Sequence, residues 1–163
     1  MMALSVRNTH PRRRVDARLL RQITLAGLAE LPEHCAVAEA ELAIVLVGAR
    51  RMAVLNERHL NHAGPTDVIT FDYAGPGTAN DRSLRGDIVI CLDVARQQAR
   101  EFGTTWQAEV VRYVVHGLLH LRGYDDLEPA ARRSLKREEN RIVRRLAGQF
   151  AFYRLGSTSS VRS

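Results

Sequence analysis

Two short apolar segments limit most strongly how this chain can fold. Ala40–Val47 and Gly86–Leu92 are rich in Val, Ile and Leu, which is typical of strands buried inside a sheet. Ala3–Arg7 is a shorter candidate strand, and Thr66–Tyr73 contains the β-branched and aromatic residues that favour extended structure. The sequence therefore predicts a sheet of about four strands.

Helices are expected between and after these strands, because apolar residues recur at helical spacing there or a capping residue opens the segment. They cover Val15–Leu31, Ala49–His59, Asp93–Phe102 with Asp93 as its cap, a segment from Thr104 or Thr105 to about Leu121, and Glu128–Ala147. This order predicts an α/β (α+β) fold, in which a small mixed sheet of about four strands packs with about five helices in a single domain. We expect residues 1–155 to form that domain and residues 156–163 to be a disordered polar tail.

Positive charge is concentrated at the two ends of the chain. The formal net charge is +6, yet residues 15–128 hold eleven basic and sixteen acidic residues. Residues 129–163 hold nine basic residues and two acidic ones. An acidic body with basic ends favours a polyanionic partner such as a nucleic acid.

The sequence predicts neither a membrane protein nor a disulfide framework. No apolar run approaches the ~18 residues of a membrane span, and residues 1–14 lack the apolar centre of a signal peptide. Cys35 and Cys91 lie far apart, each within an apolar stretch. We therefore expect a cytoplasmic protein.

The segment Val110–Asp126 (VVRYVVHGLLHLRGYDD) suggests a metal site. His116 and His120 are four residues apart on a predicted helix, so both imidazoles project from one face and can reach one cation. Gly123 can end the helix in a left-handed conformation, after which Asp126 can return as a third ligand. Three protein ligands leave a fourth position open to water, as in catalytic zinc sites, and the carboxylate also suits manganese, iron or nickel. The alternative is a pair of core histidines followed by solvated aspartates.

The spacing of this motif also matches the metzincin proteases, H-E-x-x-H-x-x-G-x-x-H, with one decisive difference. Gly117 stands where those proteases have the glutamate that acts as general base. A peptidase is therefore disfavoured, and the metal alone or another group has to activate the metal-bound water. Glycine inside a helix costs ~1 kcal/mol relative to alanine, so we expect Gly117 to admit a close approach of backbone or substrate.

The motif HGLLHLRGYDD resembles the signature of the YbeY family, H-G-x-L-H-L-x-G-Y-D-H, at every specified position except the last. Other blocks of this chain are similar to that family and follow the same order: Leu55-Asn56, Thr66–Phe71 (TDVITF), Gly86–Ile90 and Gln97–Gly103. The resemblance covers about residues 40–126.

This resemblance implies a bacterial metal-dependent endoribonuclease with an α/β fold, one zinc ion per chain and cleavage of single-stranded RNA. It also implies a role in maturing the 3′ end of 16S ribosomal RNA and in ribosome biogenesis and quality control. The implied partners are ribosomal RNA precursors, the ribosome or small-subunit proteins. In this chain the implied metal ligands are His116, His120 and Asp126, with the metal-bound water as the catalyst.

Two positions depart from the family pattern. Asp126 replaces the third histidine of the signature. The basic residue that the family places near RNA falls at Leu60, and Arg58, two positions earlier, is the candidate to replace it. Arg58 is also the candidate side chain to act in catalysis beside the metal-bound water.

Within the last predicted helix, residues 132–145 contain seven basic residues against Glu138 and Glu139. We expect it to bind RNA phosphates through Arg137, Arg141 and Arg144; the alternative is a solvated face. Two other functions stay open: a ribosome-associated RNA-binding factor with a structural metal, and a metzincin-like metallopeptidase. A site closed by four protein ligands favours the binding factor, and an open position favours the endoribonuclease.

Overall fold

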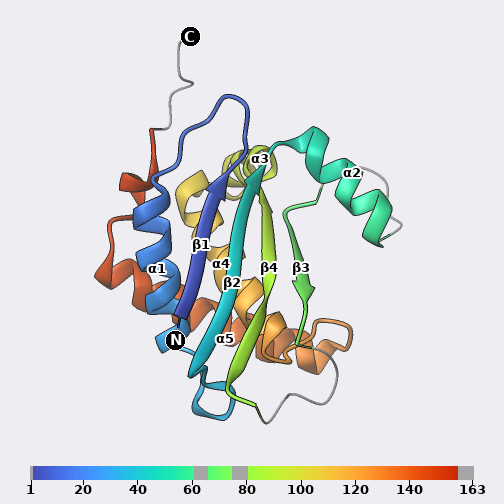
Figure 1. Cartoon of the computed structure of the whole chain (residues 1–163). Helices are drawn as coiled ribbons and strands as arrows, with labels where there is room; N and C mark the ends of the chain where they lie inside the picture. The colour runs from blue at the N-terminus through green and yellow to red at the C-terminus, as the bar shows by residue number, and fades with distance from the viewer. Residues whose placement is uncertain (1, 61–65, 75–80, 158–163) are drawn as a thin grey trace.

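The computed structural model describes residues 2–60, 66–74 and 81–157, and a four-stranded sheet lies at the centre of this part of the chain (Figure 1). The strands are β1 (Met2–Asn8), β2 (Glu39–Val47), β3 (Val68–Asp72) and β4 (Ser83–Cys91). Their spatial order is β1-β2-β4-β3, with β1, β2 and β4 parallel and β3 antiparallel at one edge. The predicted mixed sheet is confirmed.

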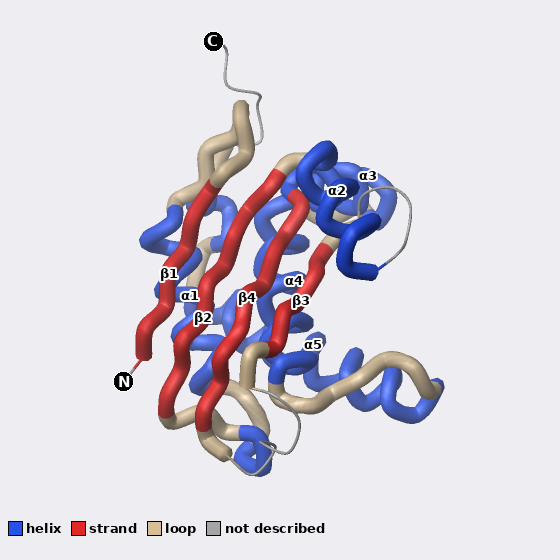
Figure 2. The backbone as a smooth tube through the Cα atoms, turned by 45° about the vertical axis from the view of Figure 1, so that its right-hand side comes forward, coloured by secondary structure: helices blue, strands red, loops and turns tan. Residues whose placement is uncertain are grey.

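Five α-helices accompany the sheet in the described residues. They are α1 (Ala17–Ala29), α2 (Ala49–Leu60), α3 (Leu92–Phe102), α4 (Trp106–Leu121) and α5 (Pro129–Gln149), with short 3₁₀ turns η1 (Glu33–Cys35) and η2 (Phe152–Leu155). Figures 1 and 2 show α1, α4 and α5 covering one face of the sheet. On the opposite face Met52 of α2 packs with Val47, Ile69 and Val89 in a second, smaller apolar cluster.

Helix α4 is the central helix of the fold. It packs against α1, α3, α5, β3 and β4, and twelve of its sixteen residues are buried, as expected for a helix that is apolar on nearly all sides. The four remaining residues are only partly buried and follow one another at intervals of four: Ala108, Arg112, His116 and His120. Residues at this spacing share one side of a helix, so α4 has a single accessible stripe and both histidines lie on it.

Gly117 lies on the other side of α4, against the sheet. A Cβ atom at this position would be 2.8 Å from Cδ1 of Ile88 on β4, closer than side-chain atoms pack. The predicted close approach therefore exists, but the approaching group is a core side chain rather than backbone or substrate. A glutamate at this position would point into the core and could not act as a general base.

The predicted role of Asp93 as the cap of α3 is wrong, while that of Thr105 is confirmed. Cys91 occupies the cap position of α3, and Asp93 lies in the first turn of that helix. The Asp93 carboxylate instead accepts hydrogen bonds from the backbone N–H of Ala49 at 2.7 Å and from Nε2 of His10 at 2.9 Å. It therefore stabilises the beginning of α2 rather than that of α3. Thr105 accepts from the N–H of Ala108 and caps α4.

Three further expectations concern the two cysteines, the polar tail and membrane-spanning helices. Cys35 and Cys91 are buried free thiols. Of the predicted polar tail, residues 158–163 lie outside the described residues. Within the described residues, no helix has the length and apolar character needed to cross a membrane.

Candidate metal centre

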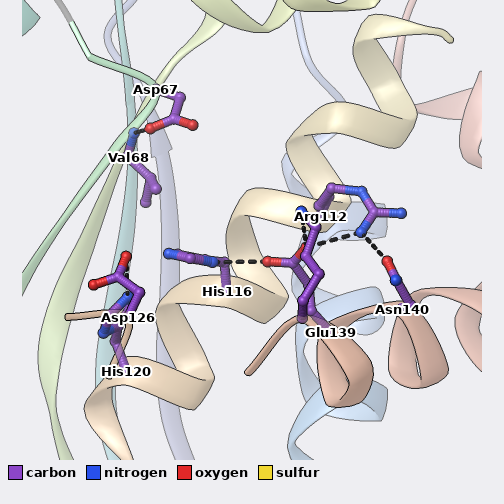
Figure 3. Close-up of polar contacts among 9 residues, drawn as sticks. Asp67, Val68, Arg112, His116, His120, Asp126, Glu139 and Asn140 are labelled. Atoms are coloured by element: carbon purple, nitrogen blue, oxygen red, sulfur yellow. Dashed lines mark hydrogen bonds and ion pairs between the residues drawn. The ribbon is translucent and has the colours of Figure 1, made fainter. Parts of the chain in front are cut away.

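Three side chains meet where α4 ends: His116, His120 and Asp126. Their nearest possible ligand atoms all lie within 4.8 Å of one another. The two imidazole rings are 4.5 Å apart between centroids, and Nε2 of His120 is 3.6 Å from Oδ2 of Asp126. Figure 3 shows the three side chains converging from the helix and from the segment that follows it.

These distances suit a metal ion. Ligands held tetrahedrally at ~2.1 Å from a zinc ion lie about 3.4 Å from one another. The side chains of His116, His120 and Asp126 are 25%, 24% and 46% exposed, so one side of the group is open to solvent. Two imidazoles and one carboxylate can therefore hold a divalent ion and leave a further position for water or substrate.

The turn after α4 gives Asp126 its position. Gly123 adopts a φ of 100°, and the N–H of Tyr124 donates to the carbonyl of Leu119, so the chain reverses at the end of the helix. Asp125 uses its carboxylate locally, since Oδ1 accepts from the N–H of Leu127 at 3.0 Å. As a result, Asp126 rather than Asp125 joins the two histidines.

Arg122 anchors this turn to the rest of the fold. Its guanidinium donates to the carbonyl oxygens of Cys35 at 2.9 Å, Ser83 at 3.0 Å and Asp81 at 3.0 Å. These three acceptors belong to η1, to β4 and to the residues just before β4. The arginine of the motif thus fixes the position of the turn that carries Asp126 against the sheet.

Glu139 of α5 contacts His116 from the side opposite the metal group (Figure 3). Its side chain is only 2% exposed, and Oε1 lies 2.7 Å from Nδ1 of His116. Oε2 accepts from Arg112 at 2.8 Å and from Lys136 at 3.0 Å. A carboxylate in this place keeps the proton on Nδ1 and leaves Nε2 of His116 free to bind a metal.

The charges around the histidines favour this arrangement. Burial raises the pKa of Glu139, but the hydrogen bonds from His116, Arg112 and Lys136 outweigh it and lower the pKa to about 2. Burial and the neighbouring His116 lower the pKa of His120 below that of an ordinary histidine. At neutral pH, Glu139 is therefore charged and His120 is a neutral imidazole, the form that binds metals.

The structure separates the three arginines expected to contact RNA. Arg141 is held by Glu138, whose carboxylate is 2.6 Å from its Nε, and by the carbonyl of Glu30 at 2.8 Å. Arg137 and Arg144 are exposed, and neither has a hydrogen-bond or ion-pair partner among the described residues. Of these three arginines, only Arg137 and Arg144 therefore have charges that no protein group in the described part of the chain neutralises.

Arg58 and Leu60 lie near the end of α2. Arg58 is exposed, and among the described residues no hydrogen bond or ion pair links it to the metal group. Leu60 is the last residue of α2, and the following residues 61–65 lie outside the described part of the chain. The proposed substitution of Arg58 for the basic residue of the family pattern stays a prediction.

Comparisons with known proteins agree on one family. Residues 5–147 match the family model described as Endoribonuclease YbeY. An Endoribonuclease YbeY from Anaeromyxobacter sp. (strain Fw109-5) is 41% identical over 143 residues, which cover 88% of this chain and 71% of the relative. Another from Chlorobium luteolum is 35% identical over 145 residues, covering 89% and 98%. A solution structure of a Thermotoga maritima protein, at 22% identity, matches 90% of both chains with a TM-score of 0.63, which supports the fold.

Proposed function

The chain belongs to the YbeY endoribonuclease family, and we propose that it is a metal-dependent enzyme that cleaves single-stranded RNA by hydrolysis. The observation that carries the proposal is the group of His116, His120 and Asp126, with its donor atoms close together and one side open to solvent. An open ligand position is what a catalytic ion requires and a purely structural one does not. It favours the enzyme over an RNA-binding factor with a structural metal.

Each residue of the site has a definite role in this proposal. His116, His120 and Asp126 hold the ion, Glu139 orients the His116 ring, and Gly123 allows the turn that carries Asp126. A divalent ion bound there supplies a Lewis acid that makes water a better nucleophile and stabilises negative charge on the phosphoryl oxygens. Water adds to the phosphorus, the bond to the leaving oxygen breaks, and that oxygen takes up a proton.

We assign zinc as the metal, because two of the three ligands are imidazoles. The carboxylate of Asp126 adds negative charge where the family pattern has a third histidine. This change shifts the preference of the site toward harder metal ions. Manganese or iron are accordingly the ions to compare with zinc.

The proposed substrate is a ribosomal RNA precursor, and the proposed role is 3′-end maturation of 16S ribosomal RNA during ribosome assembly in the cytoplasm. The basic helix α5 and Arg58 are the proposed sources of phosphate contacts. Arg58 and every arginine of α5 except Arg141 are exposed, and arginine keeps its positive charge at neutral pH. The ribosome or proteins of its small subunit are the proposed partners.

Metal analysis of the purified protein, combined with RNA cleavage before and after chelation, tests the proposal. We expect about one bound divalent ion per chain, following the three-ligand group, and cleavage of a labelled single strand that stops on chelation and returns on adding zinc. The same sequence as a duplex serves as the control and should be cut far more slowly. Undiminished cleavage by the metal-free protein would contradict the proposal, and metal and RNA binding without cleavage would support the binding factor instead.

A further inference from the structure

Arg132 and Lys136 lie one turn apart on α5, where Arg132 contacts the metal group itself and Lys136 contacts the carboxylate that supports it. Nε of Arg132 donates to the backbone carbonyl of Asp126 at 3.2 Å. Nζ of Lys136 is 3.0 Å from Glu139, whose other carboxylate oxygen holds His116. We call these two residues the metal-side pair.

The metal-side pair keeps charge available to a ligand. The Lys136 side chain is 63% exposed although it contacts Glu139, and Arg132 is exposed as well. Glu139 itself is 2% exposed and also accepts from Arg112. Its single negative charge is thus shared between two cations and shielded from solvent, so it offsets only part of the positive charge of Arg112 and Lys136.

The opposite flank of α5 has its charges engaged within the protein. Arg141 contacts Glu138 and Glu30, and Nε of Arg145 is 3.2 Å from the Glu30 carboxylate. Arg137 and Arg144, seven residues apart, share the outer face of the helix opposite its buried residues. We call Arg137 and Arg144 the outer pair.

The accessible stripe of α4 leads along the same side. Arg112 precedes His116 by one turn on that stripe and donates to Asn140 of α5 at 2.7 Å. The side of the molecule that carries the open metal group is therefore bordered by Arg112 on α4 and by Arg132 and Lys136 on α5. A polyanion that approaches the metal group along α5 passes these cations.

We propose that the metal-side pair is a phosphate-binding subsite, which holds backbone phosphates of the RNA next to the bond that is cleaved. This inference rests on the proposed function and adds the position of the bound RNA. The RNA runs along the flank of α5 that carries the metal-side pair rather than over the outer face of the helix. Both side chains donate to phosphate oxygens, Arg132 through its guanidinium and Lys136 through a compact ammonium group.

A matched pair of double variants tests the subsite. Arg132→Gln with Lys136→Gln and Arg137→Gln with Arg144→Gln each remove two positive charges from the same helix. Binding of a fluorescent single-stranded RNA is measured over a series of salt concentrations. Two lost phosphate contacts should reduce the log–log salt slope by ~1.4 in the metal-side variant, since each contact contributes ~0.7 on single strands. The outer variant should keep the native slope.

The unique lysine allows a second test on the unaltered protein. Lys136 is the only lysine of the chain, so amine acylation followed by mass spectrometry reports on it with the N-terminal amine as internal reference. We expect bound single-stranded RNA to protect Lys136 at least several-fold and to leave the N-terminal amine unchanged. This measurement stays decisive if the metal-side variant folds poorly or loses metal through its link to Glu139.

The outcomes separate this inference from the proposed function. If the native protein neither binds nor cleaves single-stranded RNA, the proposed function fails. If it binds RNA but Lys136 is not protected, or if only the outer variant loses salt dependence, the subsite is wrong while the endoribonuclease stands.

Discussion

Nδ1 of His116 lies 2.7 Å from Oε1 of Glu139, a carboxylate that belongs to α5 rather than to the metal-binding motif. Helix α5 therefore does more than add positive charge: its inner side supports a histidine of the candidate metal centre. A carboxylate behind a metal-binding imidazole fixes the ring and raises its basicity. Because this carboxylate is held by Arg112 and Lys136 as well, the orientation of His116 depends on three helix positions outside the ligand group.

Replacing Glu139 by glutamine should weaken metal binding without removing a ligand. Glutamine keeps the shape of the side chain but loses the charge, and such outer partners are worth 10–100-fold in metal affinity. Competition titration with a chromophoric zinc chelator gives the dissociation constant. Glu138→Gln is the control. This substitution removes the same charge one position earlier, from a residue that contacts Arg141 instead of His116. Native zinc affinity in Glu139→Gln would show that the contact with His116 is incidental.

The stabilisation by Glu139 should depend on pH in a defined direction. Its pKa is lowered from 4.5 to about 2 in the folded chain, so its contribution to the free energy of unfolding is present above pH 4.5 and is lost as the pH falls toward 2. Urea unfolding of the metal-free protein and of Glu139→Gln measures the difference at each pH. We expect the difference to be largest near neutral pH and to narrow below pH 4.5. A difference that stays constant down to pH 3 contradicts this assignment.

Adding one methyl group at Gly117 should destabilise the fold. In Gly117→Ala the new Cβ meets Cδ1 of Ile88 at 2.8 Å, and overpacking of this kind costs ~1–3 kcal/mol, which exceeds the ~1 kcal/mol gained in helix propensity. Thermal unfolding measures the change. Combining it with Ile88→Val removes the nearest atom and should recover part of the loss, as a double-mutant cycle will show.

Gly148 on α5 supplies the matched control for that experiment. Among the described residues nothing lies within 4 Å of a Cβ added there, so Gly148→Ala should stabilise the protein by up to about 1 kcal/mol. Equal effects of the two substitutions would show that helix propensity rather than contact with Ile88 decides the outcome at Gly117.

The part of the metal centre that could be predicted from the sequence is local. His116 and His120 are one helical turn apart, and the turn at Gly123 brings Asp126 back within ten residues, so spacing alone places these three together. The same holds for the cap of α4 at Thr105, which depends on a residue three positions later. The strands followed from short apolar or β-branched segments, and the helices from apolar residues at helical spacing or from a capping residue, all within single segments.

The part that could not be predicted depends on contacts between distant segments. Glu139 belongs to a helix whose charges suggested a solvated or RNA-binding face, and only its position on the apolar stripe with Leu135, Ile142 and Leu146 pointed to burial. Ile88, the residue that packs against Gly117, lies on the distant strand β4. Asp93 accepts from the N–H of Ala49 and so caps α2, which begins 44 residues earlier in the chain. Such pairs are set by how the elements pack, and a single sequence carries no local signal for them.

Zinc titration of Asp126→Ala beside Asp125→Ala tests the central claim most directly, because the two aspartates are adjacent and only Asp126 joins the histidines. Asp126→Ala should lose zinc affinity by orders of magnitude and lose RNA cleavage with it, while Asp126→His should keep the metal. Asp125→Ala should retain native stoichiometry, since that carboxylate serves the N–H of Leu127. Loss of zinc in Asp125→Ala with retention in Asp126→Ala would contradict the account.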